Sequence, residues 1–393
     1  MKFELAKFMA GLKRCIGIVN IEGNLEILKT FYLKPNIKKN EVHLVGSDGG
    51  IKLLDKIECE FEEGDNENVL ILQASKIYNI VKCATEDISI KDSENSAVII
   101  SGTKKWTINK EDKGEYGEVS FEKYFEVKEF KEEFDAEKFL FIIERLASNI
   151  NKPNEINPMH KQLYINDKNA YASTRSFMTI AKMEEIDGNY VFQEAIIRRL
   201  RDLLREYKGK VCLTDEFEEV AVIIKSDTFL FVYNNKAECK SEDINFMKDT
   251  DSIVLENAIV MERSKVSNLI NSAKITSEDK SISISIELGE CANGAGGKFT
   301  IHSEETNGGE FDGVTDILKY KRRAEEIKDN DKTNPEDTDI SIIKSYKCTI
   351  SIEDFYYALK IIKSEHIILR YSTYHNLISI SDETNSYRSI IAI

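Results

Sequence analysis

The chain alternates between short apolar stretches and longer segments in which apolar residues recur with the period of an α-helix. Six segments repeat apolar side chains at i, i+3, i+4 and i+7, which predicts amphipathic helices. In the first of them, Leu5, Phe8 and Leu12 belong to one apolar stripe. The six helices are predicted at about 4–19, 73–84, 135–152, 192–208, 262–275 and 351–364.

Short runs rich in Val, Ile, Phe and Tyr lie between the helical segments and predict strands. Residues 281–286 alternate Ser and Ile, so one face of that strand should be buried and the other wet. A short strand also precedes each helix, so one strand–helix–strands unit occurs six times. The main strand signals are predicted at 42–45, 51–61, 69–72, 97–101, 105–110, 220–225, 229–233, 281–288 and 378–381.

Pairing the six units predicts an α+β protein of three repeated domains. The joins between domains fall in two charged stretches, 128–135 and 239–251. A strongly charged insertion at about 315–345 lengthens the last domain, and we interpret it as a surface loop. The predicted domains are 1–128, 129–250 and 251–393.

The 393 residues carry a formal net charge of −15, which alone argues against a protein that grips nucleic acid over its whole surface. The predicted helices change this picture, because together they carry +8 and leave −23 for the rest of the chain. Basic side chains on the faces opposite the apolar stripes suit contact with phosphates rather than with bases. Plain solvation of these side chains is the alternative. The candidates are Lys7, Arg14, Lys76, Lys82, Lys138, Arg145, Arg198, Arg201, Arg205 and Lys265.

Composition narrows the class of protein further. Apolar residues make up 41% of the chain, too many and too evenly spread for a disordered protein. No run approaches the roughly 18 apolar residues of a membrane span. The N-terminal segment mixes charged with apolar residues, unlike a signal peptide. The 7 cysteines are scattered singly, which predicts reduced thiols and a cytoplasmic location.

Motifs for catalysis or metal binding are not found, so we expect no enzyme activity, no cofactor and no metal ion. The segment 289–298 is similar to a phosphate-binding loop, but Phe299 follows Lys298 and Ala292 stands at the first required glycine. A hairpin loop is therefore predicted there. The 5 histidines lack the spacing of a zinc site.

Several stretches in a fixed order are similar to one protein family. They are the opening 1–3 with the helix after it, then 74–81, 88–91, 98–102, 163–167, 171–182 and the ending 387–393. Their order and spacing over the full length, rather than any one motif, carry the similarity. The sequence resembles the bacterial-type DNA polymerase sliding clamp, the beta subunit of the replicative polymerase.

This resemblance implies a head-to-tail homodimer whose six domains close into a ring around double-stranded DNA. Helices would line the hole and sheets would form the outer wall, where acidic residues would repel DNA. Such a ring acts as a processivity factor, because it slides along DNA without regard to sequence and tethers the polymerase. DNA polymerase and clamp loader would bind through short peptide motifs, and no membrane is involved.

The resemblance also places a pocket for partner peptides between the central and last domains. This chain has Arg-Ser-Phe-Met where the family usually has a Gly-His-Arg-Leu-like turn, and Ile-Ile-Ala where a Met-Pro-Met-like tail is usual. These departures predict a different peptide and a divergent clamp, with a viral or plasmid origin left open. Ordinary sheet core is the alternative for these residues. The pocket candidates are Ser173, Arg175, Phe177, Met178, Ile390, Ile391 and Ala392.

For the dimer contact, the resemblance implies opposite charges and one apolar pair on the first and last domains. The candidates are Lys104, Lys105 and Ile108 on the first domain, and Ile275, Glu304, Glu305 and Glu310 on the last. A different class of function also stays open, in which a clamp-fold protein acts as a scaffold or decoy and is not loaded on DNA. The basic helices favour the sliding clamp, whereas the altered pocket favours the scaffold.

Overall fold

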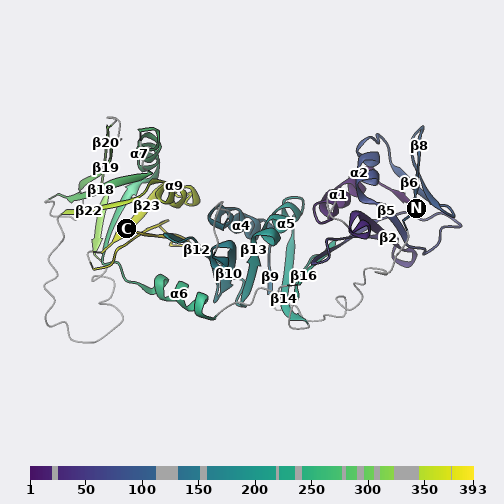
Figure 1. Ribbon diagram of the computed structural model, residues 1–393, viewed down its shortest axis with the longest axis horizontal. Helices are drawn as coiled ribbons and strands as arrows, with labels where there is room; N and C mark the ends of the chain where they lie inside the picture. Colours follow the sequence, from purple (N-terminus) through teal and green to yellow (C-terminus); the bar gives the residue numbers. More distant parts are fainter. Residues whose placement is uncertain are drawn as a thin grey trace. The chain divides into compact units, whose positions relative to one another are not determined.

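The computed structural model divides the chain into two compact units (Figure 1). Unit 1 comprises Met1–Ile143 and Ala195–Glu238, and unit 2 comprises Glu144–Glu194 and Cys239–Ile393. The division into three domains is not tested by this partition and stays a prediction. The structure describes residues 1–19, 25–111, 132–150, 157–217, 221–234, 241–276, 280–289, 296–304, 310–322, 345–372 and 374–393.

Unit 1 contains two antiparallel sheets. The smaller has the order β1 (Lys2–Phe3), β6 (Ile88–Asp92), β7 (Ser96–Ser101) and β8 (Lys104–Asn109). In the larger, β4 pairs with β16, which joins strands from two distant parts of the sequence. Its order is β5 (Leu70–Gln73), β2 (Thr30–Asn36), β3 (Glu41–Ser47), β4 (Ile51–Glu58), β16 (Phe229–Asn234), β15 (Ala221–Lys225), β14 (Lys210–Phe217) and β9 (Glu132–Asp135).

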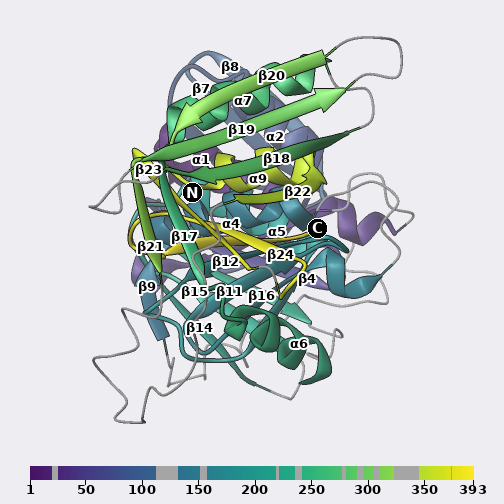
Figure 2. The same cartoon turned by 90° about the vertical axis from the view of Figure 1, so that its left-hand side faces the viewer.

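Unit 2 also contains two antiparallel sheets. The order of the larger is β13 (Tyr190–Gln193), β10 (Gln162–Asn166), β11 (Asn169–Ser173), β12 (Phe177–Lys182), β25 (Tyr387–Ala392), β24 (Leu377–Ser381), β23 (His366–Tyr371), β17 (Asn257–Glu262) and β21 (Lys319–Arg322). The smaller has the order β20 (Glu310–Asp316), β19 (Gly297–Glu304), β18 (Ser281–Leu288) and β22 (Ser345–Ser351). Figure 2 shows β18, β19 and β20 side by side, with α7 behind them.

All six predicted helices are confirmed, with ends within a few residues of the expected ones. They are α1 (Leu5–Ile16), α2 (Ala74–Lys82), α4 (Ala136–Ile150), α5 (Glu194–Arg205), α7 (Arg263–Thr276) and α9 (Ile352–Ile361). Short 3-10 helices span η1 (Glu26–Lys29), η2 (Ile37–Lys39) and η3 (Pro158–Lys161).

Two segments predicted to connect or interrupt domains contain regular structure. The predicted join at 239–251, which stays a prediction, contains α6 (Ser241–Ser252), a helix with a weak apolar stripe. The expectation of a surface loop is wrong at the start of the insertion, because β20 runs to Asp316 and β21 pairs with β17. Buried Ile317 and the pairing with β17 explain why charged residues form a strand there. The rest of the insertion, 323–344, lies outside the described residues.

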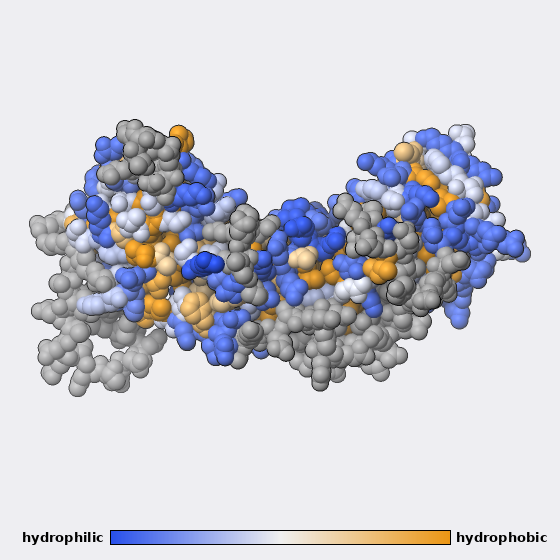
Figure 3. All heavy atoms as spheres, in the orientation of Figure 1, coloured by the Kyte–Doolittle hydropathy of each residue, from blue (hydrophilic) through white to orange (hydrophobic). Residues whose placement is uncertain are grey.

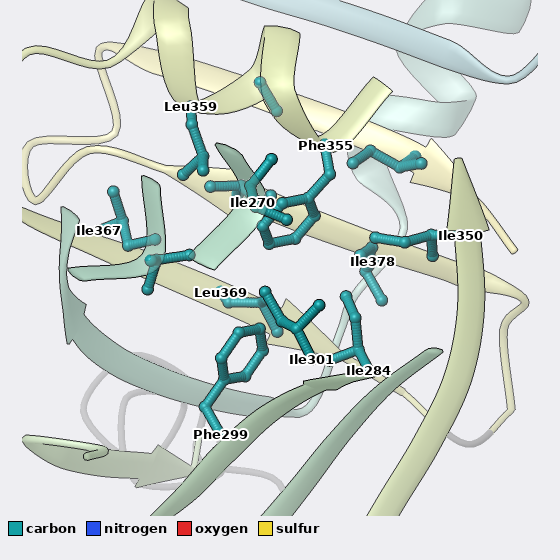
Figure 4. Packing of buried hydrophobic residues seen from close by; sticks show 14 of the residues in the cluster. Ile270, Ile284, Phe299, Ile301, Ile350, Phe355, Leu359, Ile367, Leu369 and Ile378 are labelled. Carbon is teal, nitrogen blue, oxygen red and sulfur yellow. The ribbon is translucent and has the colours of Figure 1, made fainter. Parts of the chain in front are cut away.

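The core of unit 2 fills the space between its sheets and its helices. Figure 4 shows Phe355 and Leu359 of α9 and Ile270 of α7 packed with Ile284, Phe299 and Ile301 from the smaller sheet and with Leu369 and Ile378 from the larger. The rings of Phe299 and Phe355 stack with centroids 6.4 Å apart. Each helix therefore buries one stripe, and its opposite face is available for polar side chains.

In unit 1, α1 packs unusually close to β4. A Cβ atom at Gly11 would come within 2.5 Å of Ile57 Cδ1 and 2.7 Å of Asp55 Oδ2, so a larger residue there would displace these side chains. Two ion pairs also join α1 to β4, one between Lys7 and Glu58 and one between Arg14 and Asp55. Seven helical residues and three strand residues both span about 10 Å, which lets both pairs form in one register.

The Arg14–Asp55 pair is buried. Arg14 Nη2 donates to Asp55 Oδ2 at 2.7 Å, and Nε donates to the same oxygen at 3.2 Å. Asp55 Oδ1 has no hydrogen-bond partner among the described residues. Burial therefore raises the pKa of Asp55 from 3.8 to about 6, although the charge of Arg14 opposes the shift.

This pKa predicts the sign of a pH effect on stability. Because the folded protein holds a proton on Asp55 at a pH where the unfolded chain has lost it, the contribution of Asp55 to stability falls as pH rises from about 4 to 6. Relative to Asp55→Asn, the wild type should gain about 1 kcal/mol of unfolding free energy when the pH is lowered from 7 to 5. Urea unfolding of both proteins at each pH measures this difference, and a constant or opposite difference would contradict the assignment.

Candidate nucleic-acid interface and partner pocket

The helices α1 and α2 of unit 1 contact each other and present lysines to solvent. Their buried stripes include Phe8 and Leu12 on α1 and Ile77 and Val81 on α2. Away from these stripes, exposed lysines occur on both helices, namely Lys7, Lys13, Lys76 and Lys82. Sequence reasoning missed Lys13, although its place on the helical wheel, far from Phe8 and Leu12, was a signal for it.

Two of the predicted basic residues on α1 also bind carboxylates of their own unit. Lys7 is exposed but pairs with Glu4 at 3.3 Å and with Glu58, and these partners, Glu58 first, raise its pKa. Arg14 is only 11% exposed and is held by Asp55. The expectation that Arg14 projects away from the packed face is therefore wrong, because a helical wheel cannot reveal an acidic partner on a strand 41 residues later.

On α5 the basic residues divide by exposure. Arg198 and Arg205 are exposed, whereas Arg201 is half-buried. Asp202 lies 3.5 Å from Arg201 Nε and 3.7 Å from Arg205 Nη1. The opposite side of the helix buries Ile196, Ile197, Leu200, Leu203 and Leu204, as the sequence predicts.

On α4, Lys138 is exposed but Arg145 is not a free surface cation. The guanidinium of Arg145 lies 4.5 Å from the ring centroid of Tyr387, which comes from β25. Burial lowers the pKa of Arg145. The prediction that Arg145 projects into solvent is thus wrong, since a tyrosine more than 200 residues away covers it.

On α7, the predicted Lys265 is exposed and pairs with Glu262 at 2.9 Å. Lys274, which was not singled out from the sequence, is also exposed and lies 4.4 Å from the ring centroid of Tyr356. In Figure 3 hydrophilic residues cover much of the visible face of each unit, and apolar residues form smaller patches. The helices of both units therefore combine a buried apolar stripe with an exposed basic face.

The predicted pocket residues meet on paired strands of unit 2. In the pairing of β12 with β25, Phe177 lies opposite Ile391 and Met178 lies opposite Ile390. Phe177 and Ile391 belong to the hydrophobic core, so the alternative of sheet core holds for these two. Ser173 is buried at the end of β11, while Arg175 and Ala392 are exposed. The turn between β11 and β12 is fixed by Ser176, whose hydroxyl donates to Asp354 Oδ2 at 2.7 Å.

A shallow pocket lies on the sheet face opposite this core. Of the predicted residues, Ile390 lines it, and Met178 is its neighbour across the strand pair. Arg388 at the pocket binds Asp251, and burial lowers the pKa of Arg388. The buried hydroxyl of Ser379 has no hydrogen-bond partner among the described residues, so it can serve a ligand. Sequence reasoning missed the other lining residues, which are Thr250, Ile253, Leu255, Arg370, Leu377, Ser379 and Arg388.

The predicted dimer residues lie mostly at the outer strands of the two smaller sheets. Lys104 and Lys105 are exposed on β8, and Glu310 is exposed at the start of β20. Ile275 on α7 is 85% exposed, the highest exposure among the large apolar residues described. Ile108 is buried within its own unit, which contradicts its place in an exposed apolar pair. Glu304 is on β19, and Glu305 lies outside the described residues.

Solved structures with this arrangement are found over the full length of the chain. The DNA polymerase III subunit beta from Pseudomonas aeruginosa matches with a TM-score of 0.76 and 13% identity, covering 100% of this chain and 99% of that chain. The DNA polymerase sliding clamp from Bacillus subtilis matches with a TM-score of 0.76 and 15% identity, covering 100% and 97%. The chain has the fold of a DNA polymerase III beta sliding clamp.

The similarity to clamp structures holds at low sequence identity. The Helicobacter pylori beta clamp bound to a DNA ligase peptide also matches, with a TM-score of 0.72 and 12% identity over 100% of this chain and 99% of that chain. No protein-family model and no curated protein matches the sequence. The low identity agrees with the prediction of a divergent clamp.

Two further features bear on the expectations from sequence. The strands β18 and β19 pair in antiparallel fashion up to Leu288 and Gly297, as a hairpin requires, and residues 290–295 between them lie outside the described residues. Lys298 pairs with Asp316 at 2.6 Å. Among the described residues, no helix has both the length and the apolar character needed to cross a membrane.

Proposed function

We propose that this chain is a DNA sliding clamp, a ring-shaped processivity factor that encircles duplex DNA and tethers a DNA polymerase. The observation that carries the proposal is the clamp fold over 100% of the chain. The clamp itself has no catalytic role in this proposal, and acts as an accessory subunit of the polymerase. The three repeated domains would be 1–128, 129–250 and 251–393.

The exposed cations of the helices, together with half-buried Arg201, are the proposed DNA contacts. Phosphate contacts of this kind attract DNA without fixing a sequence, which suits a ring that must slide. Arg14 and Arg145 leave the predicted set, because Asp55 and Tyr387 hold them within the protein. The revised set is Lys7, Lys13, Lys76, Lys82, Lys138, Arg198, Arg201, Arg205, Lys265 and Lys274.

The proposed ring is a head-to-tail homodimer, since two chains of three domains supply six. Exposed Ile275 and the outer strands β8 and β20 support a joint in which the first domain of one chain meets the last domain of the other. Lys104 and Lys105 would face Glu310 across this joint, and each exposed ion pair would contribute little to the free energy of dimer formation.

The pocket beside Ile390 is the proposed site for peptides of the polymerase and the clamp loader. The bound ligase peptide in the Helicobacter pylori clamp supports peptide binding by this fold. A lining that combines Ile253, Leu377 and Ile390 with the Ser379 hydroxyl suits a short segment with an apolar side chain and a backbone acceptor.

If the protein encircles DNA, whether it stays bound to linear duplex DNA should depend on whether the DNA ends are blocked. Protein is incubated with linear duplex DNA whose ends are then blocked with streptavidin, and the complex is washed in 1 M salt at roughly a 3 Å screening length. A clamp should stay on blocked DNA and leave after a restriction cut. Loss of the protein from blocked DNA would contradict encirclement and favour the scaffold or decoy.

Reversing the charge of exposed arginines on α5 should weaken DNA binding. In Arg198→Glu/Arg205→Glu, two phosphate contacts are lost, so the slope of log K against log salt should fall by about 1.8. Fluorescence anisotropy with a short duplex measures the slope. The control Lys38→Glu/Lys39→Glu makes the same change of charge at exposed lysines of η2 in the same unit. Equal losses in both variants would refute a specific role for α5.

Replacing Ile275 should separate the subunits. Each ring would contain two joints, and burial of one isoleucine side chain contributes about 1.5–3 kcal/mol. Ile275→Asp should therefore raise the dimer dissociation constant by at least about 100-fold. Sedimentation equilibrium measures it, with Tyr374→Asp as the control because Tyr374 is also largely exposed. An unchanged constant for Ile275→Asp would place the joint elsewhere.

Blocking the pocket should remove peptide binding and leave DNA binding intact. The labelled protein is applied to an array of random hexapeptides, and the bound sequences define the accepted motif. Ile390→Arg should lose these peptides because the long side chain fills the pocket and places a third cation beside Arg370 and Arg388. Ile393→Arg introduces the same side chain at an exposed position of the tail and should keep them. Retention of the same peptides by Ile390→Arg would exclude this pocket.

A further inference from the structure

Three potential metal ligands gather on the outer face of the hairpin formed by β19 and β20. His302 lies directly opposite Asp312 in the strand pairing, and Glu310 is two residues before Asp312, so all three side chains share one face. His302 Nδ1 is 2.8 Å from Asp312 Oδ1 and 3.9 Å from Glu310 Oε1. One ligand atom from each residue lies within 4.8 Å of the other two.

The strand that carries the histidine is fixed by the core on its other face. Phe299, Ile301 and Ser303 alternate with His302 along β19 and are buried. Phe299 stacks on Phe355 of α9, and Ile301 is part of the same core cluster. The backbone under His302 is therefore held in place, and the pairing of β19 with β20 sets the positions of Glu310 and Asp312 beside it.

The donor set indicates the class of ion. Zinc binds imidazole nitrogen and carboxylate oxygen at about 2.0–2.2 Å, which places tetrahedral ligand atoms about 3.4 Å from one another. The two distances from His302 Nδ1, 2.8 and 3.9 Å, lie on either side of that value. Magnesium and calcium prefer sites made entirely of oxygen. An imidazole with two carboxylates suits a divalent transition metal ion.

Other histidines of the chain provide a comparison. His43 is 2.9 Å from Glu41, and His366 is 3.5 Å from Glu383 and lies opposite Glu262 in the pairing of β17 with β23. Among the described residues, His302 with Glu310 and Asp312 forms the group of three that can meet at one ion. The other two histidines therefore lack the convergence of three ligand atoms that His302, Glu310 and Asp312 show among the described residues.

We propose that His302, Glu310 and Asp312 bind one divalent transition metal ion, with zinc as the representative ion. The three protein ligands leave at least one coordination position for water. The bound ion links β19 to β20, the outer strand of its sheet, and stabilises that pairing. The site stands on this geometry and does not depend on DNA encirclement.

Calorimetric titration of the full chain with zinc chloride tests the site, with cobalt(II) absorption as a second readout of the ligand geometry. The wild type should bind one ion per chain. His302→Asn and Asp312→Asn should each weaken binding at least tenfold, whereas the matched control His366→Asn should bind as the wild type does. Circular dichroism in EDTA checks that the variants are folded.

Three results would overturn the proposal. The first is the absence of saturable zinc binding by the wild type. The second is binding that persists unchanged in both His302→Asn and Asp312→Asn. The third is binding that disappears in Cys83→Ser, which would assign the ion to this exposed thiol instead. The readout is metal binding by the isolated chain, so failure here is distinguishable from failure of the DNA or dimer tests.

Discussion

The fold depends on two strand pairings that join distant parts of the sequence. In unit 1, β4 pairs with β16, and in unit 2, β12 pairs with β25. Without these pairs, four hydrophobic strands would expose unpaired backbone groups, which is costly and promotes aggregation. Because Phe177 and Ile391 pack into the core next to α9, the pairing of β12 with β25 also positions the pocket. The part of the chain that carries β12 and β16 therefore contributes to the stability of both units.

The helices then explain how an acidic protein presents basic surfaces. Each helix covers a sheet with one apolar stripe, and the opposite face is free of packing constraints. Lysine and arginine tolerate such faces because their long side chains keep the charge in water. Arg14 and Arg145 mark the limit of this rule, since Asp55 and Tyr387 are near enough to hold them. A net charge of −15 thus says little about any one surface.

Local patterns predicted the parts of the structure that depend on local physics. Periodicity gave the six helices and alternation gave strands such as β18, because one buried face determines both patterns. The helix α6 was not predicted because its apolar stripe is weak, and β21 was not predicted because its partner β17 is distant in sequence. The residues that line the pocket were not predicted for the same reason. Ser379, Arg388 and Thr250 come together only in the tertiary fold, so no local sequence pattern indicates that they are neighbours.

The C-terminal strand β25 shows why a sequence resemblance can predict the fold without predicting the specificity of a binding site. Neighbouring residues of β25 alternate between two environments, so Ile391 fills the core while Ile390 lines the pocket. An isoleucine suits the core position through its shape and apolar area, whatever peptide the pocket accepts. At the proposed pocket position the same side chain would determine which peptide fits. The fold persists at 13% identity, and in the proposed clamp the specificity of the pocket would be free to change, because core and pocket lie on opposite faces of one strand.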